Sequence, residues 1–138
     1  MLVRCFAVVA VASTLTSCPP SVHVTPSGSL QSGVVFRLSD GINGVEIPFD
    51  VISVTVCKKL SDPECIWIWD THGQQRLQMI RYGAKYKGLS DKVRPEGLER
   101  GHRYDVDVVA KHPSTFLYGF GHFEIDEGGT VIDASQTH

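Results

Sequence analysis

The sequence lacks the features that mark most enzymes and nucleic-acid-binding proteins. Its 138 residues carry 13 Lys and Arg against 15 Asp and Glu, so no positive excess predicts a nucleic-acid partner. It contains no Gly-x-Ser-x-Gly motif and no His-x-Glu-x-x-His motif. We therefore expect no enzyme active site, no cofactor, no metal ion and no small-molecule substrate.

Helical periodicity and long apolar runs are also absent. No stretch repeats its apolar residues with a period of 3.6, and no run after the first twelve residues approaches the ~20 that span a bilayer. The hydrophobic content of 42% and the charged content of 20% are ordinary for a globular protein. These values predict one compact domain rather than disorder.

The N-terminus has the layout of a secretory signal. Arg4 precedes the apolar run Cys5–Ala12, which is followed by Leu15-Thr16-Ser17-Cys18. An aliphatic residue, two small residues and a cysteine resemble the lipobox of bacterial lipoproteins. The resemblance implies that residues 1–17 are a signal peptide and that Cys18 becomes acylated and attached to a membrane. Because Pro19 rather than Asp follows, it also implies the outer membrane, facing the periplasm.

Four cysteines are few, and two fall in the N-terminal segment. If Cys5 is removed and Cys18 is lipidated, Cys57 and Cys65 remain, and a pair in an exported chain predicts a disulfide. Closing this short loop stabilises the fold by about 2.6 kcal/mol in the chain-entropy model. The alternative is a two-thiolate metal site, which would need a histidine at finger spacing that the sequence does not provide.

Residues 18–33 are expected to be the lipidated cysteine and a flexible tether. Pro, Ser, Thr and Gly dominate residues 19–33, a composition typical of linkers. A flexible coil of this length reaches about 20 to 25 Å, which would lift the domain off the membrane.

Residues 34–138 are expected to form an all-β domain, a β-sandwich of six to seven short strands. In residues 49–57 an alternation places Ile52, Val54 and Val56 on one face. Between Gly83 and Gly97 we expect a long connection with at most one short strand. The other β-prone segments are 34–38, 65–69, 76–82, 104–110 and 116–126. In the last of these, glycines at 119 and 121 indicate a bulge or a close approach.

One segment resembles a known fold. Leu98, Gly101 and Tyr104 have the spacing of the corner that precedes a strand in fibronectin type III and related immunoglobulin-like domains. The resemblance implies that the leucine packs in the core, the glycine makes the turn and the tyrosine hydroxyl bonds to the preceding backbone. It supports an immunoglobulin-like or fibronectin III-like sandwich.

Two tryptophans are candidates for partner binding. Side chains two residues apart on a strand share a face, so Trp67 and Trp69 are expected on the face of Cys65. The residues two and four positions before Cys57 are polar, which indicates that the face of the two cysteines is exposed to solvent. This parity predicts an exposed pair, a typical binding hot spot. The alternatives are that a tryptophan packs in the core, as in immunoglobulin-like domains, or that a bulge breaks the parity.

Charged residues and histidines allow two interpretations. Asp105 and Asp107, two residues apart on one strand, need solvent, a cation or a basic partner. His112 and His122 could approach across a hairpin near them, although exposed loop histidines are the simpler reading. Eight of the thirteen basic residues fall between positions 76 and 103. This asymmetry indicates either internal charge balance or a polar docking surface.

These features predict a non-enzymatic lipoprotein whose domain binds a protein partner in the periplasm. Its size, anchor and corner resemble those of immunity lipoproteins, which neutralise toxins of secretion systems. The alternative is a structural or accessory lipoprotein of an envelope or secretion assembly.

Overall fold

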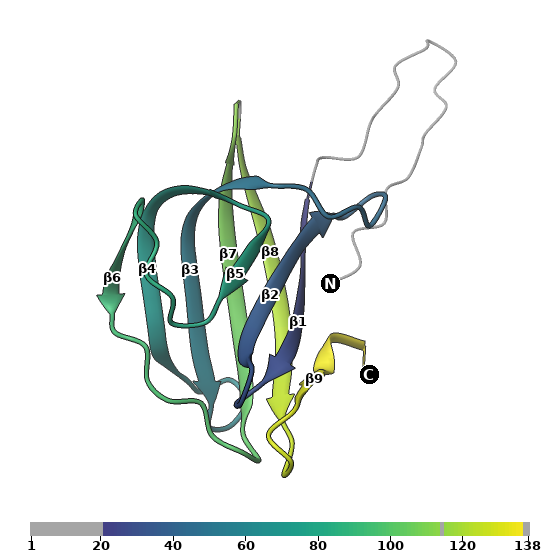
Figure 1. The fold of residues 1–138 in the computed structure, drawn as a ribbon, viewed down its shortest axis with the longest axis vertical. Coiled ribbons are helices and arrows are strands. Elements are labelled where there is room, and N and C mark those ends of the chain that lie inside the picture. The colour runs from purple at the N-terminus through teal and green to yellow at the C-terminus, as the bar shows by residue number, and fades with distance from the viewer. Residues whose placement is uncertain (1–20, 114, 137–138) are drawn as a thin grey trace.

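The fold is two packed antiparallel β-sheets. A computed structural model describes residues 21–113 and 115–136, so the signal peptide at 1–17 and Cys18 lie outside the described residues. One sheet has the order β1-β2-β5, and the other has the order β6-β4-β3-β7-β8-β9 (Figure 1). The elements are β1 (Val22–Ser29), β2 (Gly33–Asp40), β3 (Phe49–Lys59), β4 (Cys65–Leu77), β5 (Met79–Arg81), β6 (Leu89–Val93), β7 (Arg103–His112), β8 (Thr115–Ile125), β9 (Val131–Asp133) and the 3-10 turn η1 (Ala134–Gln136).

The hydrophobic core lies between the sheets and has an aromatic centre. Phe36 of the three-stranded sheet packs against Phe123, with ring centroids 5.5 Å apart. Phe123 in turn stacks on Tyr104 at 5.2 Å. All three are almost fully buried. Aromatic pairs of this geometry contribute beyond the apolar area that they bury, so they tie the two layers together.

The segment expected to be a tether is instead a strand. β1 pairs along its whole length with β2, and its alternate residues Val22, Val24 and Pro26 are buried. The composition is that of a linker, but its period of two allows burial of one face against the core. Pro26 is tolerated because β1 is an edge strand of its sheet. The ordered domain therefore begins at least a dozen residues earlier than expected.

The alternation expected in β3 is interrupted by a bulge. The register of β3 shifts between Val51 and Ser53 against both neighbouring strands, and against β7 Ile52 is the extra residue. Val51, not Ile52, consequently joins Val54 and Val56 in the core.

Two further segments differ in detail from the expected strands. The single strand expected over residues 76–82 is divided, because β4 ends at Leu77 in one sheet and β5 pairs with β2 in the other. The long connection between Gly83 and Gly97 does contain one short strand, β6, which pairs with β4 at the edge of its sheet.

The corner before β7 is held by one tyrosine. The Tyr104 hydroxyl accepts a hydrogen bond from the backbone N–H of Glu99 at 2.8 Å. Gly101 adopts φ +76°, in the left-handed region that favours glycine, and its N–H donates to the Ile125 carbonyl. Leu98 packs against the core. Burial raises the pKa of the Tyr104 phenol, so the group stays neutral there.

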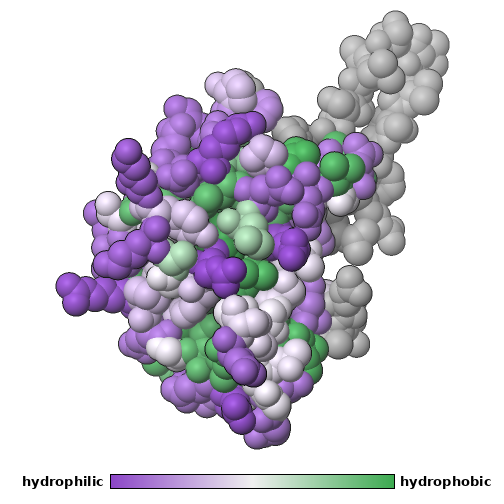
Figure 2. Space-filling model, in the orientation of Figure 1, coloured by the Kyte–Doolittle hydropathy of each residue, from purple (hydrophilic) through white to green (hydrophobic). Residues whose placement is uncertain are grey.

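The side of the molecule seen in Figure 1, where the three-stranded sheet lies in front, carries little continuous apolar surface. In Figure 2 hydrophilic residues spread over this side and hydrophobic residues form several small patches between them. Scattered apolar residues are ordinary on a protein surface and indicate no docking site.

We expect Tyr104→Phe to lower the free energy of unfolding by about 1 kcal/mol, because the Glu99 N–H loses its acceptor in a partly buried position. Tyr118→Phe is the matched control, since the Tyr118 side chain is exposed, and its effect should stay within about 0.5 kcal/mol. Urea denaturation measures both. Equal effects of the two changes would contradict the role given to Tyr104.

Candidate functional site

The two candidate tryptophans lie on opposite sides of the sheet. Trp67 is 60% exposed, whereas Trp69 is fully buried. Val56 pairs with Trp69 and the next residue, Cys57, pairs with Trp67, so Ile68 is an extra residue in β4. Because of this bulge, the side chains of the two tryptophans point to opposite faces of the sheet, although they are two residues apart. The exposed pair predicted from parity is therefore wrong for Trp69 and holds for Trp67.

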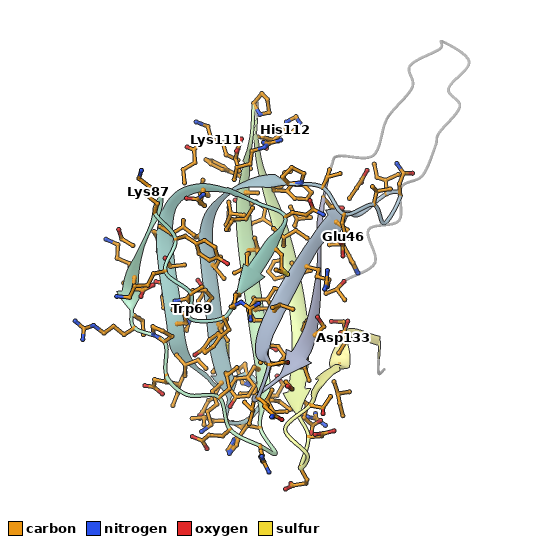
Figure 3. All side chains as sticks on the ribbon, viewed as in Figure 1. Glu46, Trp69, Lys87, Lys111, His112 and Asp133 are labelled. Atoms are coloured by element: carbon orange, nitrogen blue, oxygen red, sulfur yellow. A yellow bond between two sulfur atoms is a disulfide. The ribbon has the colours of Figure 1, made fainter. Side chains whose placement is uncertain are left out.

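Trp69 is a structural residue of the core. Its indole N–H donates to the Asp91 carboxylate at 3.1 Å, and its ring meets that of Tyr82 edge-on at 5.2 Å. Figure 3 shows Trp69 within the body of the sandwich. Because Asp91 belongs to β6, this contact fastens the edge strand to the core and leaves the indole no free polar group for a partner.

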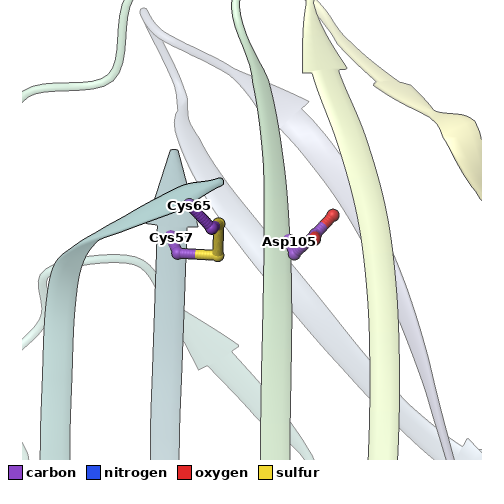
Figure 4. Close-up of side chains that lie close together, drawn as sticks. All are labelled: Cys57, Cys65 and Asp105. Atoms are coloured by element: carbon purple, nitrogen blue, oxygen red, sulfur yellow. A yellow bond between two sulfur atoms is a disulfide. The ribbon is translucent and has the colours of Figure 1, made fainter. Parts of the chain in front are cut away.

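Cys57 and Cys65 form a disulfide at the loop end of the β3–β4 hairpin, on the same face as Trp67. Their sulfur atoms and an Asp105 carboxylate oxygen lie within 4.8 Å of one another. Figure 4 shows the Asp105 carboxylate turned away from the disulfide, toward the neighbouring strand β8. Bonded sulfurs are not thiolates, so in this state the cluster does not have the ligands of a zinc site.

β8 exposes a row of aromatic side chains on the outer face of the six-stranded sheet. Phe116, Tyr118 and Phe120 alternate along the strand and are 53%, 58% and 54% exposed. We call these three residues the aromatic stripe. Three large rings in a row, uncovered by any described residue, form a surface of the kind that binds partners.

The inner face of β8 explains why the rings point outward. Gly119 and Gly121 alternate with the aromatic residues and face β1. A Cβ at Gly119 would lie 2.8 Å from the backbone oxygen of Val22. The two glycines therefore mark a close approach, one of the two alternatives, and the β7–β8 register runs without a bulge.

β7 lines the stripe with a row of charged residues. Lys111, Asp107 and Asp105 pair with Phe116, Phe120 and His122 respectively, so they share the outer face. His112 pairs instead with Thr115 near the tip of this hairpin, where Figure 3 shows it. The register thus separates His112 from His122, so the approach of the two histidines that the sequence allowed does not occur.

Asp105 is neutralised by its neighbours. His122 Nδ1 lies 2.6 Å from Asp105 Oδ1, and Lys59 Nζ lies 3.6 Å from Asp105 Oδ2. Asp105 and Asp62 raise the pKa of Lys59, the hydrogen bond to Asp62 having the largest effect. The charge of Asp105 is therefore offset by neighbouring side chains of the same domain.

Asp107 has no such neutralising contact. Its carboxylate forms no hydrogen bond or ion pair with any residue in the described part of the chain. Partial burial raises the pKa of Asp107, the negative charge of Asp105 raises it further, and His122 lowers it. The folded domain therefore holds this carboxylate in a position that disfavours its charge.

A second histidine–aspartate pair lies across the same face on β4. His72 Nε2 is 2.8 Å from Asp70 Oδ1, and the Thr55 hydroxyl donates to the same carboxylate at 3.0 Å. Asp70 is buried, so these bonds satisfy a group that would otherwise be costly. A catalytic triad would need a nucleophile bonded to the imidazole, and among the described side chains no serine or cysteine makes that bond to His72.

The aromatic stripe has a signal in the sequence that periodicity alone does not reveal. Residues 116–123 read FLYGFGHF, with aromatic residues or histidine at every even position and Leu, Gly, Gly and Phe between them. Because apolar residues occur at both even and odd positions, the alternation alone does not show which face of the strand is buried. The glycines decide it, because only a face with no side chains lets another strand pack so closely.

Comparison of the chain with protein-family models, with curated proteins and with solved structures finds no match in any of the three. Within the described ranges, no helix is long and apolar enough to cross a membrane. The site is therefore judged on its own geometry.

We expect Asp107→Asn to stabilise the domain at pH 7. The carboxylate has a pKa raised above 3.8 in the folded state, so its charge lowers the free energy of unfolding once the pH exceeds that raised value. Below pH 3.8 both states are protonated and the advantage should disappear. Urea denaturation of both proteins across this range measures the difference.

The charged groups that face Asp107 are Asp105 on its own strand, His122 on β8 and, beyond Asp105, Lys59 on β3. Glu127→Gln, an exposed residue in the β8–β9 turn, controls for net charge and should change stability by no more than about 0.5 kcal/mol at either pH. A difference between Asp107→Asn and the unchanged protein that is independent of pH would contradict this account.

Proposed function

We propose that this protein is a bacterial lipoprotein, anchored through acylated Cys18, whose β-sandwich binds a protein partner in the periplasm. The observation that carries the proposal is the aromatic stripe of Phe116, Tyr118 and Phe120 on the outer face of the six-stranded sheet. Exposing several large apolar rings to water is energetically unfavourable, and such rows of rings are typical of binding surfaces. No catalytic arrangement among the described residues competes with this reading.

The anchor and the domain lie close together along the chain. Only residues 19–21 separate Cys18 from β1, which begins at Val22. Four extended residues reach at most about 14 Å, so the start of β1 stays within that distance of the anchor. The domain therefore works beside the membrane surface rather than at the end of a long tether. An acylated cysteine with more than one chain is sufficient for stable attachment.

The strand order supports an immunoglobulin-like or fibronectin III-like sandwich. In chain order, β1, β2 and β5 correspond to strands A, B and E of such a domain. β3, β7 and β8 correspond to C, F and G, and β4 adds to that sheet as C′. β6 and β9 are then additions at its two edges, and Tyr104 occupies the tyrosine corner of strand F. The aromatic stripe accordingly lies on strand G.

Trp67 extends the proposed face on its other side. It lies beside the disulfide, across β3 and β7 from β8, and is exposed. Between Trp67 and the stripe lie the acidic residues Asp105 and Asp107, and His122 follows the stripe on β8. An interface with aromatic anchors and a few polar groups among them is the usual composition of protein-binding sites.

Two roles fit such a face. As an immunity lipoprotein the domain would bind an incoming toxin reversibly, and the stripe would be free in the absence of that toxin. As a structural or accessory lipoprotein it would be covered constantly by a neighbouring subunit. Both roles use the same residues, and they differ in whether the partner is always present.

The anchor is tested by Cys18→Ser. We expect the variant in the soluble periplasmic fraction, whereas the unchanged protein should remain with the membranes, because the thioether to the lipid cannot form. Cys57→Ser is a useful comparison, since it removes a cysteine of the disulfide instead of the anchor cysteine and should leave the fractionation unchanged. A Cys18→Ser protein that still sediments with membranes would refute lipid anchoring.

The binding face is tested by Phe120→Ala and Tyr118→Ala in the full chain. Each should reduce recovery of a stoichiometric envelope partner at least fivefold, because truncating a central aromatic anchor typically costs more than ~1 kcal/mol of binding. Leu60→Ala is the matched control, because Leu60 is as exposed but lies in the β3–β4 loop. Crosslinking followed by quantitative mass spectrometry measures recovery. Equal recovery from all three variants would show that the stripe is not the binding face.

A further inference from the structure

Asp107 lies at the centre of the proposed face with an aromatic ring beside it. It pairs with Phe120 of the stripe on one side and with Thr55 on the other. Directly paired residues on one face have Cβ atoms about 4.5 to 5.5 Å apart, so the carboxylate and the Phe120 ring border the same spot. Both residues expose surface to solvent, although neighbouring side chains partly desolvate the Asp107 carboxylate.

The other carboxylates on this face already have side-chain partners. Asp105 contacts His122 and Lys59, Asp70 contacts His72, and Glu124 contacts Arg103 at 3.7 Å. The Thr55 hydroxyl, the nearest donor across β3, donates to Asp70 instead. Asp107 thus remains an accessible carboxylate with no hydrogen bond or ion pair to any residue that the structure describes.

We infer that this spot binds an arginine side chain of the protein partner, with the guanidinium paired to the Asp107 carboxylate and stacked on the Phe120 ring. The inference rests on the proposed function, because it specifies the chemistry of the partner at the same face. The occupant is therefore a basic segment of a protein. It lies along β8 with its other side chains against Tyr118 and Phe116.

Arginine fits the spot better than other cations do. Its planar guanidinium can pair with a carboxylate and stack on an aromatic face at the same time, whereas the lysine ammonium is a compact and strongly hydrated point charge. A divalent cation such as calcium needs six to eight oxygen ligands, and one carboxylate flanked by a phenyl ring does not supply them. Cation–π contact requires the cation within about 6 Å of the ring, which the pairing of Asp107 with Phe120 allows.

The electrostatics of the free domain agree with a cationic occupant. Partial burial and the charge of Asp105 raise the pKa of Asp107, so the unbound fold bears a cost for keeping this residue ionised. A bound guanidinium would remove that cost. Asn at this position would be easier to fold, and a residue that works against folding is expected where function requires it.

The test uses the full chain, labelled with nitrogen-15 and purified as the host processes it, in a nonionic detergent at pH 7. Three acetylated peptide amides serve as probes, Gly-Arg-Gly-Arg-Gly, the same peptide with lysine and the same peptide with glutamate. We expect the arginine peptide to shift the amide signals of Asp107, Phe120 and Tyr118 in a saturable way. The lysine peptide should bind several-fold more weakly and the glutamate peptide not at all.

Variants locate the contact. Asp107→Asn and Phe120→Leu should each weaken binding of the arginine peptide by about fivefold or more, while Glu127→Gln, with the same change of charge, should leave it unchanged. Equal binding of the lysine peptide, shifts confined to the basic segment around β6, or an unchanged affinity of Asp107→Asn would each overturn the inference. Shifts of the same signals with protein concentration alone would indicate a second copy as occupant and would also overturn it.

Failure of this inference and failure of the proposed function can be told apart. If the arginine peptide does not bind at Asp107 but Phe120→Ala still abolishes recovery of an envelope partner, the binding face stands and only the chemistry assigned to its partner is wrong. If neither experiment depends on the stripe, the proposed function fails as well.

Discussion

The close packing of β1 against β8 is the contact on which the arrangement of this domain depends. It requires that β8 present no side chain where β1 crosses it, and Gly119 and Gly121 meet that requirement. Because side chains alternate along a strand, the residues at the other parity from the glycines must face away from the core. Phe116, Tyr118 and Phe120 are therefore held outward by the same constraint that closes the sandwich. The stripe is a fixed surface of a well-packed strand.

Two β-bulges determine the composition of the outer face. The bulge in β3 brings Val51 into the core in place of Ile52, and the bulge in β4 separates buried Trp69 from exposed Trp67. Without the second bulge, the parity of the strand would expose both indoles or bury both. The bulge lets β4 supply one tryptophan to the core and another to the surface beside the disulfide.

The charges on this face are distributed unevenly, and that unevenness links stability to function. Asp105 and Asp70 are each satisfied by a histidine and a further donor. Asp107 is left in a row of side chains that disfavours its ionised form. Packing one face of a strand in the core restricts the residues on that buried face. It does not require an acidic residue without an ion pair on the exposed face. The architecture of the sandwich therefore gives no reason for this cost to folding.

The sequence by itself determined what depends on local periodicity and chemistry. An all-β fold, most of the strands, the pairing of Cys57 with Cys65 and the spacing of Leu98, Gly101 and Tyr104 follow from alternation, cysteine number and residue spacing. Only the tertiary structure decided that residues 22–29 form a strand, that Trp67 and Trp69 face opposite ways and that the aromatic stripe is uncovered. Each of these depends on which strand lies against which, and a period of two cannot say which of its two faces another sheet will cover.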